Sequence, residues 1–274
     1  MRQRLGQHFL RDQNVVKTIL AAAELSPSDA ALEIGPGKGV LTEPLSDRVQ
    51  QLVAIELDDN LADKLRTKFR SKNNVTILHS DFLKVNLSNV IGDDDKGGPR
   101  APVKVLGNLP YSITSPIFEK IMPWTAWETG VFLIQREVAA RITAQPGSRD
   151  YGILTLAVRL FAEAEMILQV QPGAFLPPPK VSSSVIRLRR KPRPLLAQAA
   201  IPDFFDLVHG AFAHRRKTIA NSLAFHAKIT RSEVEKWLTE NGLNPQARAE
   251  TVALADYVKL SNAWSIFRRE INLT

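Results

Sequence analysis

A glycine-rich segment contains the first residues whose types and spacing could do chemistry. It reads Glu33-Ile34-Gly35-Pro36-Gly37-Lys38-Gly39 and lies at the end of a short apolar run. Glycines in such a turn let the backbone bend tightly and approach a ligand closely. Val40 excludes the dinucleotide fingerprint GxGxxG, and Gly39 directly after Lys38 excludes a phosphate-binding P-loop. A turn that only connects a strand to a helix stays an alternative.

Two acidic residues accompany the next two apolar runs. Glu56 lies near the end of Leu52–Leu57, and Asp81 with Phe82 follows Val75–Leu78. A carboxylate at the position of Glu56 can accept hydrogen bonds from both hydroxyls of a ribose, although a helix-capping acid is an alternative. Asp81 suits the amino group of an adenine and Phe82 its ring face, although Asp81 could also be an ordinary turn residue. These features favour S-adenosylmethionine over NAD, because no charged residue is provided for a pyrophosphate.

The most specific signal is the segment Gly107-Asn108-Leu109-Pro110-Tyr111, which follows the apolar run Val103–Leu106. Asn-Leu-Pro-Tyr resembles the catalytic motif of adenine-N6 methyltransferases that act on rRNA. Further motifs accompany it in the order found in one family, and they are Gly6–Leu10, Glu33–Gly37, Phe175–Ser183 and His214–Leu223. Over essentially its full length, the chain resembles the KsgA/RsmA family of small-subunit rRNA adenine N6-dimethyltransferases.

The resemblance implies an S-adenosylmethionine-dependent enzyme that dimethylates N6 of two adjacent adenosines near the 3′ end of 16S-type rRNA. It also implies a role in small-subunit biogenesis, with small-subunit rRNA and the immature small subunit as partners. A large-subunit rRNA methyltransferase of the erythromycin-resistance type stays an alternative, although its motif usually has Ile at the position of Leu109. A ribosome-assembly factor that acts mainly by binding is the other alternative. The intact Glu56, Asp81 and Asn108 favour an active enzyme.

The catalytic motif can be interpreted through the chemistry of adenine. Its exocyclic amine is a poor nucleophile, because the lone pair is delocalised into the ring. The side-chain carbonyl of Asn108 and the backbone carbonyl of Pro110 could accept its two N–H bonds and position the nitrogen for attack. Tyr111 and Phe175 are expected to sandwich the target base, which offsets the free energy of extruding it. A core position that anchors the proline-rich loop is the alternative for Phe175. The predicted catalytic residues are Asn108, Leu109, Pro110, Tyr111 and Phe175.

The N-terminal motif supplies the remaining expected contacts to the cofactor. In the family an arm covers the cofactor, and the resemblance assigns His8 and Leu10 to this role. His8 stands where the family frequently has Asn, and both side chains can form hydrogen bonds. An arm that only packs across the site is the alternative. The predicted cofactor site comprises His8, Leu10, Gly35, Gly37, Glu56, Asp81, Phe82 and Asn108.

Positive charge is concentrated in the last third of the chain. The sequence has 36 basic and 28 acidic side chains, a net charge of +8. Residues 181–274 contain 15 basic and 8 acidic side chains, a net charge of +7. Nucleic acid is therefore the leading candidate partner and an acidic membrane surface the second. The predicted contacts to rRNA phosphates are Arg187 and Arg189, which alternate along a strand-like run, and Arg215, Arg216 and Lys217, which are expected to open a helix.

The elements that must position these residues follow from the apolar pattern. Short apolar runs alternate with helix-like stretches, which is typical of an α/β fold with a parallel sheet. The expected strands are Ala31–Ile34, Leu52–Leu57, Val75–Leu78, Val103–Leu106 and Val131–Ile134. Ligands bind at the carboxyl ends of such strands, where the motifs lie. With the resemblance, this predicts a Rossmann-like class I S-adenosylmethionine-dependent methyltransferase sheet and a small C-terminal all-helical domain.

The domain boundaries follow from a change in composition. We predict a methyltransferase domain over residues 1–190, a proline-containing linker over 191–202 and a helical RNA-binding domain over 203–274. A loop is expected over 91–102, where Gly, Asp and Pro predominate. The helices expected in the C-terminal domain are Phe204–Ala213, Lys217–His226, Ser232–Asn241 and Leu254–Arg268.

Other classes of protein are excluded by what the sequence lacks. It contains no cysteine, so disulfides, cysteine-ligated zinc and a thiol nucleophile are excluded, and no metal is expected. No apolar run reaches the length of a membrane-spanning helix, and the N-terminal residues lack the apolar core of a signal peptide. We therefore expect a cytoplasmic protein, although a removed organelle-targeting peptide would leave no trace. A monomer is expected because no exposed apolar stripe is obvious in the sequence.

Overall fold

The computed structural model describes residues 8–91, 102–193 and 195–272, which form two compact units. The first unit contains residues 1–139 and 162–190, and the second contains residues 140–161 and 191–274. Residues 140–161 thus group with the C-terminal part of the chain, whereas the predicted division placed them in the first domain. The loop expected over 91–102 lies almost entirely outside the described residues.

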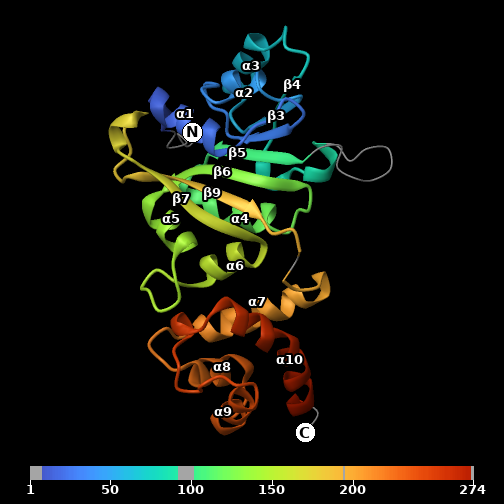
Figure 1. Cartoon of the computed structure of the whole chain (residues 1–274), viewed down its shortest axis with the longest axis vertical. Coiled ribbons are helices and arrows are strands. Elements are labelled where there is room, and N and C mark those ends of the chain that lie inside the picture. The colour runs from blue at the N-terminus through green and yellow to red at the C-terminus, as the bar shows by residue number, and fades with distance from the viewer. Residues whose placement is uncertain (1–7, 92–101, 194, 273–274) are drawn as a thin grey trace. The chain divides into compact units, whose positions relative to one another are not determined.

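The first unit is built on one mixed sheet, which is seen in the upper part of Figure 1. Within the described residues the sheet has seven strands in the order β4-β3-β2-β5-β6-β9-β7. The strands from β4 to β6 are parallel to one another, whereas β9 runs antiparallel to both β6 and β7. This arrangement confirms the predicted α/β class. The strands are β2 (Ala30–Ile34), β3 (Gln51–Glu56), β4 (Val75–His79), β5 (Val103–Asn108), β6 (Trp127–Gln135), β7 (Ala162–Val170) and β9 (Ser183–Arg190).

Helices and short turns connect these strands. The helix α3 begins after Asp58, whose side chain accepts a hydrogen bond from the Leu61 amide, and Asp12 caps α1 in the same way. A second small sheet pairs β1 (Phe9–Leu10) with β8 (Phe175–Leu176). The helices around the large sheet are α1 (Gln13–Ala22), α2 (Thr42–Ser46), α3 (Asp59–Lys68), α4 (Thr114–Ile121) and α5 (Arg136–Thr143), whose last residues belong to the second unit.

The second unit is helical. Its helices are α6 (Ile153–Phe161), α7 (Ile201–Phe212), α8 (Ile219–Ala227), α9 (Arg231–Glu240) and α10 (Leu254–Asn272). The expected C-terminal helices are therefore present, and α7 already begins inside the predicted linker, with Pro202 in its first turn.

One detail of the predicted C-terminal helices is wrong. The cluster Arg215–Lys217 does not open a helix, because it lies in the turn between α7 and α8. Thr218 has an extended backbone conformation, and its side chain accepts a hydrogen bond from the Asn221 amide. An N-cap of this kind starts the helix at the next residue, Ile219.

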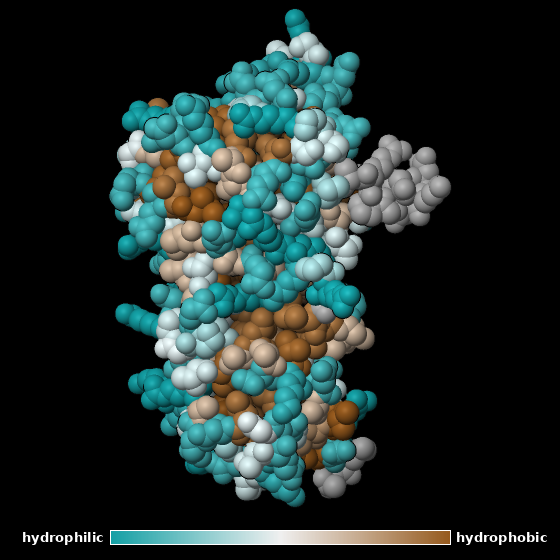
Figure 2. Space-filling model, viewed as in Figure 1, coloured by the Kyte–Doolittle hydropathy of each residue, from teal (hydrophilic) through white to brown (hydrophobic). Residues whose placement is uncertain are grey.

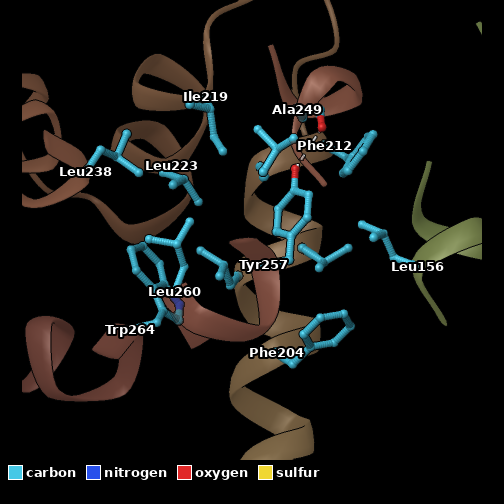
Figure 3. Packing of buried hydrophobic residues seen from close by; sticks show 14 of the residues in the cluster. Leu156, Phe204, Phe212, Ile219, Leu223, Leu238, Ala249, Tyr257, Leu260 and Trp264 are labelled. Carbon is cyan, nitrogen blue, oxygen red and sulfur yellow. Dashed lines mark hydrogen bonds between the residues drawn. The ribbon is translucent and has the colours of Figure 1, made fainter. Parts of the chain in front are cut away.

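A continuous apolar core explains why residues 140–161 belong to the second unit. Leu156 of α6 packs into the same cluster as Phe204 of α7 and Trp264 of α10, as Figure 3 shows. The hydroxyl of buried Tyr151 donates to the carbonyl of Val252 at 2.9 Å. The segment therefore covers a face of the C-terminal helices that would otherwise be apolar and exposed.

The face drawn in Figure 2 is largely hydrophilic. On the face drawn in Figure 2, hydrophobic residues are visible in patches between hydrophilic ones. Among the described helices, none is long and apolar enough to cross a membrane.

A buried tyrosine tests the core of the second unit. Tyr257 is fully buried and its hydroxyl donates to the carbonyl of Ala249 at 2.9 Å (Figure 3). Tyr257→Phe should lower the free energy of unfolding by about 1–3 kcal/mol, because the carbonyl keeps its burial and loses its partner. Tyr151→Phe should have an effect of similar size in the same unfolding transition. Denaturant unfolding measures both, and a Tyr151→Phe variant as stable as the wild type would contradict the assignment of residues 140–161 to this core.

Candidate active site

The carboxyl ends of β2 and β3 are joined through one carboxylate. Glu56, the last residue of β3, is 4% exposed. Its Oε2 accepts from the amide of Gly37 at 2.9 Å, and its Oε1 accepts from the amide of Asp58 at 2.9 Å. A carboxylate has about four acceptor positions, so two N–H bonds fix its orientation and leave capacity for further donors. This orientation is compatible with the role predicted for Glu56 as a ligand of ribose hydroxyls.

The glycine turn after β2 depends on conformations that favour glycine. Gly35 and Gly37 have φ angles of +65° and +58°, which side chains rarely adopt. A Cβ atom on Gly37 would also lie 3.2 Å from the ring of Phe9, which belongs to the arm. The turn can therefore bring its backbone close to a ligand and to the arm, as the sequence predicts.

Sequence analysis missed a role for Glu33, the first residue of the glycine motif. This residue lies in β2, is 1% exposed, and its Oε2 has no hydrogen-bond partner among the described residues. Burial raises the pKa of its carboxyl to about 8, and the nearby charge of Glu56 adds to the effect. Glu33 is therefore mainly protonated at neutral pH. An acidic residue inside an apolar strand is the sequence signal that could have identified it.

The predicted adenine contacts lie in a turn after β4. Asp81 accepts from the amide of Leu83 at 3.0 Å and caps the short helix η1 (Phe82–Lys84), which is the turn role given above as its alternative. Phe82 is 5% exposed, so little of its ring is open to a base. The amine of Lys120 lies 5.7 Å from the centre of that ring. Burial lowers the pKa of Lys120, and the charge of Asp81 opposes this change.

Asn108 is the last residue of β5, and its side chain is held by the arm. Its Nδ2 donates to the backbone carbonyl of His8 at 2.9 Å. Within the described residues, its Oδ1 receives no hydrogen bond. Since the amide is oriented through its nitrogen, its oxygen is left as the acceptor. This is the group that the catalytic prediction requires.

The backbone carbonyls after Asn108 differ in availability. The carbonyl of Pro110 already accepts from the amide of Ile113 at 3.2 Å and from the hydroxyl of Thr114 at 3.1 Å. Both of its lone pairs are thus engaged, which disfavours the role predicted for it. Leu109 is 1% exposed and donates to the carbonyl of Leu133 at 3.0 Å, and its own carbonyl receives no hydrogen bond within the described residues.

The two aromatic residues predicted to sandwich the base differ in accessibility. Tyr111 is half-buried, and its hydroxyl lies 2.7 Å from that of Ser183. Burial raises the pKa of Tyr111, and the bond to Ser183 opposes this change. Phe175 is 2% exposed and belongs to a hydrophobic core, which matches its alternative reading. In this conformation Phe175 presents almost no ring surface to a base.

The N-terminal arm covers this part of the site. In the β1–β8 pairing Leu10 lies opposite Phe175, and Leu10 is 5% exposed in the same core. The Nδ1 of His8 lies 2.8 Å from the carbonyl of Pro177, and its ring stacks 6.1 Å from that of Tyr111. The structure thus brings His8 together with Asn108 and Tyr111, and it buries Leu10 of the arm in the hydrophobic core.

Comparison with known proteins decides the family. A family model described as ribosomal RNA adenine dimethylase matches residues 1–265. The chain belongs to this family. A relative from Geobacillus sp. (strain WCH70), named ribosomal RNA small subunit methyltransferase A, is 39% identical over 94% of this chain and 90% of its own. A protein of the same name from Dehalococcoides mccartyi (strain CBDB1) is 39% identical over 94% of this chain and 87% of its own.

Solved structures agree with the adenine dimethylase family. A dimethyladenosine transferase from Plasmodium falciparum has a TM-score of 0.78 at 24% identity, over 95% of this chain and 98% of that one, and supports the fold. The 23S rRNA methyltransferase ErmE has a TM-score of 0.70 at 32% identity, over 94% of this chain and 99% of that one. The resemblance stated from the motifs is thus confirmed, and so is the Rossmann-like methyltransferase fold.

The basic residues predicted to bind RNA fall into two groups. In β9, Arg187 donates to Glu24 at 2.9 Å and to Glu165 at 2.6 Å, and Arg189 pairs with the same Glu24 at 2.5 Å. These carboxylates compete with any phosphate for the two guanidinium groups. The cluster Arg215–Lys217 is exposed, and there Arg215 donates to the carbonyl of Arg149 at 2.8 Å.

Across the part of the chain that the structure describes, no group of three or more His, Asp or Glu residues could hold a metal ion.

The raised pKa of Glu33 predicts a specific pH dependence of stability. The folded protein holds a proton on Glu33 up to a pKa of about 8, whereas the unfolded chain loses it near 4.5. The free energy of unfolding should therefore fall as pH rises between these values, by roughly 1.4 kcal/mol per pH unit from this group. Glu33→Gln cannot ionise, so the variant should gain stability over the wild type as pH rises from 5.5 to 8.5. Denaturant unfolding of both proteins at several pH values measures this, and parallel curves would contradict the assignment.

Proposed function

We propose that this chain transfers methyl groups from S-adenosylmethionine to N6 of adenine in small-subunit rRNA. Membership of the adenine dimethylase family and relatives named for the small subunit support this function. The observation that carries it is the orientation of Asn108, whose nitrogen is held by His8 and whose oxygen is free at the end of β5. An oriented acceptor at a strand end is what the amine of an adenine needs for attack.

The residues at the carboxyl ends of β2 and β3 fit S-adenosylmethionine. Glu56 presents a fixed carboxylate for ribose hydroxyls, and the turn at Gly35 and Gly37 allows close backbone approach. Asp81 and Lys120 lie beside the buried Phe82, so the adenine would meet the polar edge of this turn rather than its ring face. The cofactor supplies the electrophilic methyl group, and these residues bind and orient it.

The role of the catalytic motif is to position the target amine. Asn108 Oδ1 accepts one amine hydrogen, and the backbone carbonyl of Leu109 accepts the other. Within the described residues the Leu109 carbonyl receives no hydrogen bond, whereas the carbonyl of Pro110 already receives two. Two acceptors hold the lone pair toward the methyl group, and the proton of the methylated amine passes to solvent. Tyr111, which is partly exposed, stacks on the base. Stacking by Phe175 requires the strand pair β1–β8 to separate.

The finer details of the substrate follow from the family resemblance of the motifs. We place the two methyl groups on each of two adjacent adenosines near the 3′ end of 16S-type rRNA, within an immature small subunit. The enzyme acts in the cytoplasm as a monomer and contributes to small-subunit biogenesis.

A large-subunit substrate is the competing function, since ErmE is also similar to this chain. The identity of 39% to small-subunit relatives against 32% to ErmE favours the small subunit, as does Leu109 in the catalytic motif. Methyl transfer to small and large subunits from cells lacking the endogenous enzymes separates the two. Mass spectrometry should find dimethyladenosine in small-subunit rRNA, and modification of large-subunit rRNA alone would overturn the proposal.

A catalytic role of Asn108 predicts a selective loss of rate. Asn108→Ala should lower the single-turnover rate of methyl transfer about 100-fold or more, because orientation of the amine is lost. Binding of small subunits should change little. Asn108→Asp should retain part of the activity, because a carboxylate also accepts the amine hydrogens. Equal losses of rate and of RNA affinity in Asn108→Ala would point to a structural role.

Glu56→Ala is the matched control for that experiment. It should weaken binding of S-adenosylmethionine by about 10- to 150-fold, which corresponds to the loss of hydrogen bonds to a charged acceptor, about 1.5–3 kcal/mol. Calorimetry with the cofactor measures this affinity, and an unchanged value in Glu56→Ala would refute the assignment of Glu56.

The exposed basic turn predicts a change in salt dependence. Replacement of Arg215, Arg216 and Lys217 by Ala should weaken binding to small-subunit rRNA and leave cofactor affinity unchanged. Each lost phosphate contact should reduce the slope of log affinity against log salt by roughly 0.7–0.9. Because Arg215 is bonded to the Arg149 carbonyl, we expect a total change of about one to two units. An unchanged slope with a lower melting temperature would mean that the turn is structural.

A further inference from the structure

Helix α8 exposes a large aromatic side chain on the face opposite its core. Ile219, Ala220, Leu223 and Ala227 are buried, whereas Phe225 is 71% exposed. A single exposed apolar residue is common in soluble proteins and carries no conclusion alone. What distinguishes Phe225 is the set of side chains around it.

The ring of Phe225 is fixed by a neighbouring aromatic ring. His214 lies edge-to-face against it, with ring centres 4.6 Å apart and an interplanar angle of 78°. The carbonyl of His214 accepts from the amide of Lys217 at 2.8 Å and from the hydroxyl of Ser222 at 3.2 Å. The backbone of His214 is thereby tied to both the basic turn and α8, so the aromatic pair adjoins the turn that carries the cations.

The charged residues close to this pair in sequence have one sign. Residues 214–228 contain Arg215, Arg216, Lys217 and Lys228 and no Asp or Glu. Lys228 is exposed and lies directly after α8, where it forms the C-cap of the helix. A second copy of this chain would bring like charges together, so the surface fits an anionic partner. An aromatic ring among cations is the combination that holds unpaired nucleotides, whose bases stack while their phosphates are neutralised.

We propose that Phe225 is a stacking platform for an unpaired base of the rRNA substrate, apart from the adenine that is methylated. His214 holds the ring in place, and Arg216, Lys217 and Lys228 contact the phosphates on either side of the stacked nucleotide. This inference rests on the proposed function, because it takes rRNA as the bound partner. The proposed site binds an unpaired nucleotide in a single-stranded part of the rRNA. It is additional to the phosphate contacts of the basic turn.

The test compares substitutions of Phe225 with a control of similar exposure. Phe225→Ala and Phe225→Leu remove the aromatic face, Phe225→Trp keeps one, and Ile266→Ala removes an exposed apolar side chain of α10 that is 51% exposed. Binding is measured with small subunits from cells lacking the endogenous methyltransferase and with protein-free small-subunit rRNA. Melting temperatures verify that each variant is folded.

Stacking predicts that Phe225→Ala and Phe225→Leu weaken binding to both probes by about 5- to 150-fold. The slope of log affinity against log salt should be unchanged, because no charge is removed, and Phe225→Trp and Ile266→Ala should bind like the wild type. Full affinity in Phe225→Leu, or a loss seen with small subunits but not with protein-free rRNA, would overturn the proposal in favour of an apolar contact with a protein. Unchanged affinity in Phe225→Ala would also overturn it. The wild-type methylation assay is independent, so failure of the platform and failure of the proposed function are distinguishable.

Discussion

The hydrogen-bonded register of three parallel strands sets the position of the whole candidate site. Ile34 of β2 lies opposite Ile55 of β3 on one side and Gly107 of β5 on the other. The residues that follow these three are Gly35, Glu56 and Asn108, so the glycine turn, the proposed ribose ligand and the proposed catalytic amide emerge at one level of the sheet. A slip of one residue in either strand pair would separate these groups and reverse their sides. Gly107 helps to maintain this packing, because a Cβ atom there would lie 2.8 Å from the carbonyl oxygen of Ile34.

Two buried carboxyl groups at this edge of the sheet differ in their hydrogen-bond donors. Glu56 is oriented by the amides of Gly37 and Asp58, which donate to its two oxygens. Glu33 has one oxygen without a donor among the described residues, and burial raises its pKa to about 8. The protonation of Glu33 keeps a second negative charge away from Glu56. Glu56 is thus free to act as the acceptor for a cofactor hydroxyl.

The basic residues of the chain divide according to their partners. In the first unit, Arg187 and Arg189 are paired with Glu24 and Glu165, and these bonds link the turn after α1 to β9 and β7. In the second unit, the turn before α8 exposes its cations beside Phe225 and has no acidic residue nearby in sequence. Net charge alone does not distinguish these cases, because a cation that is neutralised within the fold contributes little to the binding of RNA.

The sequence by itself determined the α/β class, the parallel strands and the C-terminal helices, because apolar periodicity and glycine turns are local properties. It also determined the family, because its motifs are contiguous segments such as Asn108–Tyr111. Only the tertiary structure decided that residues 140–161 join the C-terminal core, since that depends on Tyr151 and Leu156 meeting residues about a hundred positions away. The same holds for the burial of Phe175 against Leu10, for the engaged carbonyl of Pro110 and for the ion pairs of Arg187. Each of these depends on which atoms from distant segments compete for a hydrogen bond or a surface, and no local pattern of residues encodes that competition.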